Sequence, residues 1–416
     1  MTVWWSACFT VSSFFVVCLS GDRFNNIPKL DEEKLMNIDC HPHYFLECQV
    51  SYWWWRVVPV SLIVIGTVGN VLSLLVLLRK NLRRLSASVY LLFLAASDLL
   101  FIWSYTVRET LYAITGINLI NLSSVFCRGL FWMGLTSASF SIWLLVSLTI
   151  ERVFMTRFPV YSYQRLTPKL ATKICCALLV VVMVANGHVI FGFTLHDVDT
   201  FSEGSNFSEV HRRIIERFPC QFISEEYFLF YVTYWNMIYM IFFNIIPIII
   251  ITTGNISIAA TILTQRKKMK VHPVSSCGNT TAVSCKTSVS EQRQISSLRH
   301  VYDAERLPKF NDVNTSEPRD STQNNSSVTR LLFVICAFFV ITTVPFAVFY
   351  VFKPHVQEVS YKGVARIQLI QSVIHSLMFS NFSLNFFLYF VSGTLFKQEW
   401  TRLKAEVRNK MHCVSI

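Results

Sequence analysis

One carboxylate lies inside a long apolar stretch of the chain. Asp98 occupies the end of the segment Leu-Ala-Ala-Ser-Asp, which begins at Leu94. An isolated charge in hydrocarbon is costly, so such a group must pair, bind a cation or stay protonated. The polar residues available in other apolar runs are Asn70, Ser141, Asn381 and Asn385. The sequence therefore predicts a buried polar cluster around Asp98.

A second charged pair, Glu151-Arg152, closes the third apolar run. By position alone, these two residues are equally well explained as ordinary charges at a membrane interface. The remaining histidines, acids and cysteines are scattered over different predicted sides of a membrane. The sequence has no Gly-rich phosphate loop and no Cys-x-x-Cys pair. We therefore expect no enzyme activity and no cofactor.

Seven apolar runs dominate the chain, which is 53% hydrophobic and only 15% charged. Each run can cross about 30 Å of hydrocarbon, which takes roughly 20 helical residues. Runs of this length must be helices, because a helix satisfies its own backbone hydrogen bonds in lipid. The sequence predicts an all-α membrane protein with a seven-helix bundle over 56–392. The predicted helices are 56–78, 87–112, 124–155, 169–193, 227–262, 328–352 and 363–390.

The charges between the runs predict the orientation. Lys and Arg gather after the first, third, fifth and seventh runs, whereas residues 113–123 carry no charge and 194–226 mix acids with bases. Basic loops stay in the cytoplasm. We therefore expect the N-terminus outside and the C-terminus inside, in a multi-pass protein of the plasma membrane. The net charge of +12 then indicates cytoplasmic loops and membrane lipid rather than nucleic acid.

The segments outside the bundle have distinct compositions. Residues 1–20 are apolar and end in small residues, which is typical of a signal peptide, although an uncleaved hydrophobic tail is the alternative. Residues 21–55 form a polar outer segment. The stretch 263–327 is polar and predicts a disordered cytoplasmic loop. Residues 393–404 predict an amphipathic helix on the inner leaflet, followed by the cytoplasmic tail 405–416.

Features of the outer loops agree with this orientation. The glycosylation motifs at Asn121 and Asn206 lie in predicted outer loops. Cys127 and Cys220 lie at outer helix ends, where disulfides are allowed. Cys40 and Cys48 remain as a second outer pair that is close enough in sequence to form a small bridged loop.

An ordered set of motifs across 56–400 resembles the rhodopsin-like G-protein-coupled receptors. Asp98 and its neighbours resemble the second-helix motif of that family, and Glu151-Arg152-Val153 stands where it keeps Glu/Asp-Arg-Tyr. Pro247 and Pro345 match the prolines of the fifth and sixth helices. Asn385-Phe-Phe-Leu-Tyr389 stands where Asn-Pro-x-x-Tyr is usual.

The resemblance implies roles for these residues. Cys127 and Cys220 would form a disulfide, and the cluster of Asn70, Asp98, Ser141, Asn381 and Asn385 would hold a Na⁺ ion in the inactive state. The resemblance implies that activation repacks a set of switch residues, frees Arg152 for a G protein and swings Tyr389 inward. These switch residues are Ile142, Glu151, Arg152, Pro247, Phe339, Pro345 and Tyr389. Arrestin and receptor kinases are further implied partners, and the Ser and Thr residues of 263–327 are the expected phosphorylation region.

Departures from the family pattern favour one branch of it. Thr343 replaces the usual sixth-helix tryptophan, Phe386 replaces the seventh-helix proline, and Asn255 replaces a fifth-helix tyrosine. This combination resembles FMRFamide- and myosuppressin-like peptide receptors, and also chemoreceptor-like sequences of the same branch. These departures affect the expected switch mechanism rather than the fold.

The ligand class follows partly by exclusion. Gly134 occupies the position where amine receptors carry an aspartate, and Phe379 occupies that of the opsin lysine. A neuropeptide is the favoured ligand, with a small lipid, metabolite or chemosensory molecule as the alternative. The candidate ligand-binding residues at the outer helix ends are Arg108, Glu109, Gln371 and His375. Glu109 either meets an arginine of the ligand or pairs with its neighbour Arg108.

Overall fold

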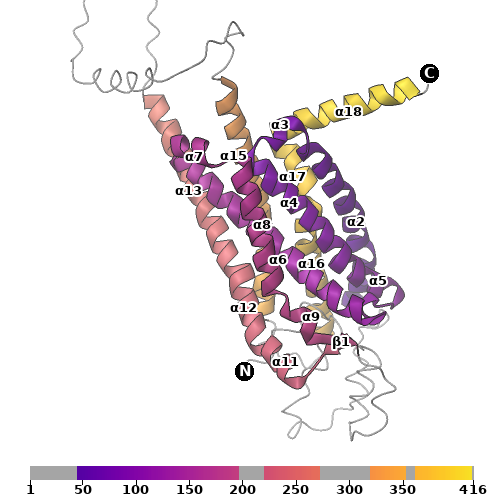
Figure 1. Cartoon of the computed structure of the whole chain (residues 1–416). Helices are drawn as coiled ribbons and strands as arrows, with labels where there is room; N and C mark the ends of the chain where they lie inside the picture. Colours follow the sequence, from indigo (N-terminus) through magenta and orange to yellow (C-terminus); the bar gives the residue numbers. More distant parts are fainter. Residues whose placement is uncertain (1–44, 196–219, 272–318, 353–360, 415–416) are drawn as a thin grey trace, which may run out of the picture.

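The computed structural model describes residues 45–195, 220–271, 319–352, 361–414, and this part of the chain is almost entirely helical (Figure 1). The elongated bundle consists of α2 (Leu46–Leu77), α4 (Ser86–Phe101), η4 (Ile102–Thr106), α5 (Val107–Thr115), α6 (Ser124–Arg157), α8 (Pro168–Ala185), α9 (His188–Gly192), α11 (Glu225–Leu229), η7 (Phe230–Trp235), α12 (Asn236–Met240), η8 (Ile241–Ile245), α13 (Ile246–Val271), α15 (Arg319–Phe352), α16 (Tyr361–Ser383) and α17 (Asn385–Ser392). The connecting and terminal elements are α3 (Lys80–Arg83), η5 (Leu119–Asn121), α7 (Pro159–Arg165), β1 (Phe193–Leu195), β2 (Cys220–Phe222) and α18 (Thr394–Val414).

The helices account for the predicted membrane spans. Within the described residues, six spans are long and apolar enough to cross a membrane, and the bent pair α16 and α17 makes a seventh. Several spans join more than one element: α4, η4 and α5 are continuous, and so are α11 to α13. The predicted seven-helix bundle is confirmed.

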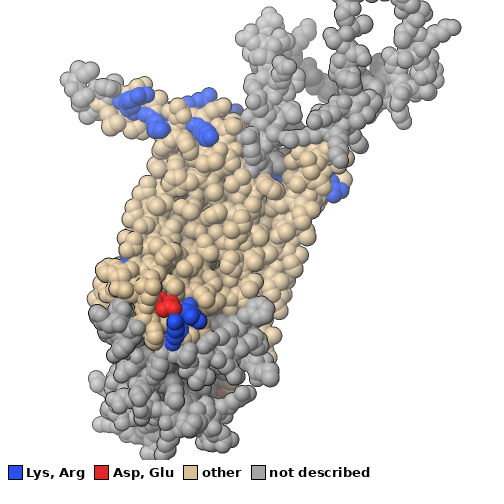
Figure 2. Space-filling view, turned by 180° about the vertical axis from the view of Figure 1, so that it is seen from behind, with Lys and Arg blue, Asp and Glu red and all other residues tan. Residues whose placement is uncertain are grey.

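The two ends of the bundle differ. At one end, β1 and β2 pair antiparallel, with Thr194 opposite Gln221; we call this the hairpin end. At the other end, α18 leaves the bundle and runs away from it (Figure 1); we call this the α18 end. Figure 2 shows Lys and Arg side chains gathered mainly around the α18 end, above an uncharged middle band. That distribution suits a protein whose middle lies in hydrocarbon.

The third span forms the centre of the bundle. In α6, 78% of an 18-residue apolar segment is buried inside the protein, whereas the corresponding share is 22% in the span formed by α8 and α9. Ser123 caps the N-terminus of α6 by accepting a hydrogen bond from the backbone N–H of Phe126. The central position of α6 brings its polar residues into contact with several other helices at once.

The first and last helices are longer than predicted from hydropathy. The first begins at Leu46 rather than at 56, so Trp53 to Trp55 lie within it. The last helix, α18, continues to Val414, beyond the predicted 393–404 and through most of the predicted tail. A helix satisfies its own backbone hydrogen bonds, so it continues past the apolar run that defines the span.

The predicted loop 263–327 is also shorter in the structure. Helix α13 continues to Val271 and α15 begins at Arg319, so both ends of that stretch are helical. Residues 272–318 lie outside the described part of the chain, as do the expected signal peptide and most of the outer segment.

Candidate functional site

The predicted polar cluster forms around Asp98, in the core of the bundle. Ser141 of α6 donates a hydrogen bond to Oδ1 of Asp98 at 2.8 Å. Asn385, the first residue of α17, donates its side-chain N–H to Oδ2 at 2.6 Å. Asp98 is only 1% exposed. One carboxylate thereby connects the second, third and seventh spans.

Asn70 contributes to the same region through the backbone. Its side-chain N–H donates to the carbonyl oxygen of Phe382 at 2.8 Å. The seventh span bends by 57° between α16 and α17, at Leu384. In a straight helix the Phe382 carbonyl would accept from the N–H of Phe386, across this break. Asn70 therefore satisfies a carbonyl next to the bend.

The oxygen atoms of this cluster are suitable ligands for a small hard cation. The carboxylate of Asp98, the Ser141 hydroxyl and the side-chain oxygen of Asn70 are the kind of oxygen ligands that such ions take. Asn381 of α16 is buried, at 8% exposed, but no hydrogen bond joins it to Asp98 among the described residues. Oδ1 of Asn70 is buried and has no hydrogen-bond partner in the described structure. The same described residues contain no group of three His, Cys, Asp or Glu that suits a transition metal.

Arg152 is held within the bundle at the α18 end. Its Nη2 lies 3.4 Å from Oε1 of Glu151, and that oxygen also accepts a hydrogen bond from Ser86 of α4 at 2.7 Å. Nη1 contacts the sulfur of Met155 at 3.1 Å. Both charged residues are 4% exposed. The pair is therefore buried between helices rather than being an ordinary interfacial pair.

The other expected switch residues lie in helices α6, α13, α15 and α17, and most of them are buried. Ile142 and Phe339 belong to one hydrophobic cluster, and Tyr389 of the same cluster is 0% exposed. The hydroxyl of Tyr389 is buried without a hydrogen-bond partner in the described structure. Pro247 is also buried and is the second residue of α13, which begins where the π-helical segment η8 ends, while Pro345 is half-buried within α15.

The hairpin end is tied to α6 by the disulfide between Cys127 and Cys220. Phe131, one turn later in α6, stacks on Phe193 of β1 with ring centroids 4.7 Å apart. Cys48 is also disulfide-bonded. Cys40 lies outside the described residues, so the pairing of Cys40 with Cys48 stays a prediction.

Arg108 and Glu109 form an ion pair at this end, with Nη2 to Oε1 at 2.6 Å. The guanidinium carbon lies 4.9 Å from the ring centroids of both Tyr105 and Phe131. Two alternatives were predicted for Glu109, and the structure contains the pair with Arg108. A bond between two adjacent helical residues is unusual, because neighbouring side chains on a helix point in different directions.

His375 and Gln371 lie together on α16. Nδ1 of His375 is 2.8 Å from the backbone oxygen of Gln371. The imidazole is 4% exposed and packs near the rings of Trp55 and Phe346, at 5.6 and 5.8 Å. His375 is therefore a packed residue with a local partner on its own helix.

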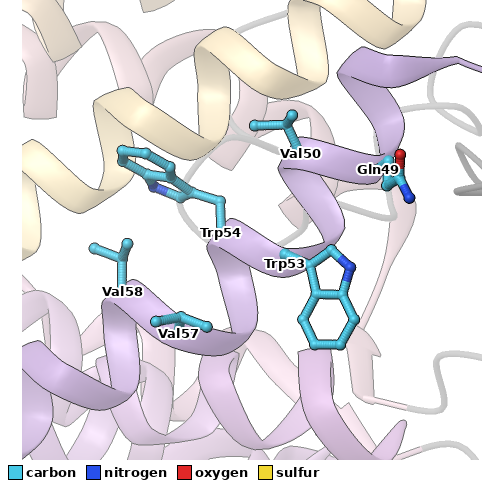
Figure 3. A pocket seen from close by; sticks show the side chains of 6 residues that line it. All are labelled: Gln49, Val50, Trp53, Trp54, Val57 and Val58. Carbon is cyan, nitrogen blue, oxygen red and sulfur yellow. The ribbon is translucent and has the colours of Figure 1, made fainter.

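A shallow apolar groove of about 440 Å³ lies on α2 near its start (Figure 3). It is lined by Gln49, Val50, Trp53, Trp54, Val57 and Val58. Trp54 donates its indole N–H to Ser376 of α16 at 2.8 Å, whereas Trp53 is 60% exposed. The groove therefore lies on the surface of an apolar span.

Sequence analysis missed an ionic network that joins α18 to the loop after α2. Glu399 accepts hydrogen bonds from Arg79 at 2.7 Å, Asn81 at 2.8 Å and Arg402 at 2.5 Å. Arg79 also pairs with Glu406 at 2.6 Å. Burial alone would raise the pKa of Glu399, but the three hydrogen bonds outweigh it and lower the pKa below its ordinary value. The sequence did contain one indication of this network: Glu399 is an acid in a segment that is otherwise rich in Lys and Arg.

Comparison with protein-family models gives a match over residues 69–389 to the 7 transmembrane receptor (rhodopsin family) model. The chain belongs to this family. No curated protein matched the chain. Rhodopsin-family members are receptors rather than enzymes, so this multi-pass membrane protein is a G-protein-coupled receptor with an extracellular ligand and a G protein as partners. The type of ligand is a separate question.

Proposed function

We propose that this rhodopsin-family receptor responds to an extracellular neuropeptide of the FMRFamide-like class. The hairpin end faces outward, the α18 end faces the cytoplasm, and the receptor acts at the plasma membrane. The observation that carries the peptide proposal is the buried Arg108–Glu109 pair at the hairpin end. Charged groups in a ligand-facing region suit a peptide better than a purely apolar ligand.

One observation favours the alternative, a small lipid, metabolite or chemosensory ligand. Aromatic rings crowd the hairpin end around His188, whose ring centroid lies 4.2 Å from that of Trp235 and 5.9 Å from that of Tyr227. Such a lining suits an apolar molecule. The two proposals share the same fold and signalling partner, and they differ in what an activation screen finds.

Activation is a shift between two packed arrangements. A ligand at the hairpin end stabilises one of them, and a G protein at the α18 end stabilises the same one. In the inactive arrangement Glu151 holds Arg152, and Asp98 ties the second, third and seventh spans, with Na⁺ as a further stabilising ion. Activation releases Arg152 and moves Tyr389. Receptor kinases and arrestin then act on the Ser and Thr residues of 263–327.

The first test is calcium release in cells that co-express this receptor and a promiscuous G protein, screened against amidated neuropeptides. We expect one or more Arg-Phe-amide peptides to activate at nanomolar concentration, a typical peptide affinity. Arg152→Ala should abolish the response at equal surface expression. Arg157→Ala is the matched control, because Arg157 lies at the same helix end but is exposed and bonds only Ser257 among the described residues.

Each result has a distinct meaning. Silence across the panel, with the receptor shown at the cell surface, would move the proposal to a small apolar ligand. A full response in Arg152→Ala would contradict the role of Arg152 as the switch, while leaving the peptide proposal in place.

A further inference from the structure

A buried thiol joins three spans in the half of the bundle near the α18 end. Cys336 of α15 is 2% exposed, and its sulfur lies 3.5 Å from Oγ1 of Thr149 in α6. The side chain of Asn255 in α13 also forms a hydrogen bond with this thiol. We call these three residues the thiol contact. It connects the third, fifth and sixth spans at one place.

The donors and acceptors of the thiol contact follow from its neighbours. Thr149 has one hydroxyl proton, which it donates to the backbone oxygen of Leu145 at 2.8 Å. Its oxygen is therefore the acceptor for the S–H group of Cys336. Nδ2 of Asn255 carries two N–H groups and gives one to the backbone oxygen of Ile251 at 2.8 Å. The second N–H is left for the sulfur, which thus accepts from α13 and donates to α6.

Two of the three helices approach each other closely at this place. Gly254 precedes Asn255 in α13, and a Cβ atom at this glycine would lie 2.5 Å from Cγ2 of Thr149. Two carbon atoms do not pack at that distance, so a residue without a Cβ lets α13 lie this close to α6. The close approach brings Asn255 beside Thr149. Helices α13 and α6 are thus packed tightly together, and the thiol joins α15 to both of them.

The use of sulfur makes this contact easy to open. A thiol is a weak donor and a weak acceptor, so its hydrogen bonds stabilise less than those of a hydroxyl group. Opening the contact therefore costs little, whereas opening a buried ion pair costs much more. A weak contact between spans suits a receptor that changes between two packed arrangements of similar free energy.

The thiol contact also lies next to the residue proposed to meet the G protein. Thr149 is one helical turn before Arg152 on α6, and Arg152 is 4% exposed. A G protein reaches so buried a guanidinium only after a neighbouring span has moved. We infer that the thiol contact holds α15 in the inactive arrangement, and that opening it raises G-protein coupling without any ligand. This inference uses the receptor function of the family and is independent of the class of ligand.

The first test removes the acceptor of the S–H group. Thr149→Val keeps the shape of the side chain and removes its oxygen. Ligand-free activation of the promiscuous G protein, measured as GTPγS binding in membranes at equal surface expression, should rise about threefold, the shift that one lost hydrogen bond gives. Thr149→Ser keeps the oxygen and should leave coupling unchanged. Ser147→Ala is the matched control and should also leave it unchanged, because Ser147 bonds its own helix at Trp143.

A double variant separates one shared bond from two unrelated losses. Cys336→Ala should raise ligand-free coupling by about the same factor as Thr149→Val. If the two side chains act through one bond, the double variant should couple no more strongly than the stronger single variant. Two unrelated losses would multiply, to about ninefold, and that result would contradict the inference.

Alkylation of the thiols reports the opening of α15 without a G protein. N-ethylmaleimide should label Cys336 slowly in the unaltered receptor, because the thiol is buried, and about threefold faster in Thr149→Val. Mass spectrometry of the peptide that contains Cys336 measures this rate. Cys175 of α8 is also buried, and its labelling should be the same in every variant. Cys176 is exposed and supplies the reference rate.

The two measurements together decide the inference. Faster labelling of Cys336 with stronger ligand-free coupling in Thr149→Val is the expected result. Unchanged coupling in this variant would overturn the inference, whatever the labelling rate. An equal acceleration at Cys175 would also overturn it, because the whole bundle would then have loosened. A peptide screen without any response would leave the inference standing, since neither measurement uses a ligand.

Discussion

Asp98 connects three spans with two hydrogen bonds, and this makes its charge testable. Asparagine at 98 can still accept from Ser141, but its N–H group would face the N–H donor of Asn385. Asp98→Asn should therefore abolish the sodium sensitivity of agonist binding, measured by competition binding in NaCl against choline chloride. Ser147→Ala is the control, since Ser147 bonds its own helix at Trp143. Retained sodium sensitivity in Asp98→Asn would contradict the ion site.

The sequence predicted Ser141 and Asn385 as companions of Asp98, and both bond it in the structure, but it also predicted Asn381, which has no hydrogen bond to Asp98 among the described residues. Apolar context alone marked Asp98, Ser141 and Asn385, because polar groups in hydrocarbon need partners. Asn70 instead bonds the Phe382 carbonyl, which is accessible because of the bend after it. Hydrogen-bond partners depend on helix rotation and bending, which a one-dimensional pattern does not contain. The Arg108–Glu109 pair was likewise not predictable with certainty, because it depends on how the helix turns these two neighbouring side chains.

At the scale of elements, α18 is fixed to the bundle by Glu399. The Glu399 side chain is 4% exposed, whereas that of Glu406 is 56% exposed, and both bind Arg79. Glu399→Gln should lower the apparent melting temperature of purified receptor by a few degrees, about what the loss of one buried ionic contact gives in a protein of this size. Glu406→Gln is the matched control and should have a much smaller effect. If both variants lowered the melting temperature equally, the buried contact of Glu399 would not be what fixes α18 to the bundle.

The pH dependence of this contact has a definite sign. The pKa of Glu399 is lowered in the folded state, so its contribution to stability is present above the ordinary glutamate value of about 4.3 and is lost as the pH falls through the lowered value. We expect the effect of Glu399→Gln on melting to be constant between about pH 6 and 8. A steep change across that range would show that another group controls α18.

The spans were predictable as elements, but their irregularities were not. Hydropathy located every span, since the length of an apolar run is set by the membrane. The π-helical segments η4, η7 and η8 and the bend at Leu384 leave no such mark. Phe386 replaces the proline that is usual in the seventh helix of this family, and the span nevertheless bends by 57° beside it. Hydrogen bonds from Asn70 to Phe382 and from Asn385 to Asp98 accompany the bend, and residues so far apart in the chain leave no local sequence pattern that predicts it.

At the scale of the whole molecule, orientation is the outstanding prediction. Asn121 lies in η5 at the hairpin end, and Asn206 lies outside the described residues. If that end is extracellular, Asn206→Gln and Asn121→Gln should each remove one glycan, seen as a step in gel mobility that glycosidase treatment also produces. Asn279 lies in a further glycosylation motif, Asn-Thr-Thr, within the predicted cytoplasmic loop, and Asn279→Gln should leave mobility unchanged. Loss of a glycan only in Asn279→Gln would reverse the topology.

The bend without a proline also has a kinetic consequence. A proline ring would remove an N–H donor and hold the seventh span bent by covalent geometry. Here the bend depends on Asn70 at Phe382 and on Asp98 at Asn385, and such bonds open and close. Their lifetime then sets how fast the span straightens. Deuterium uptake at the amides of Asn385 and Phe386 would follow that rate, and Na⁺ would slow it.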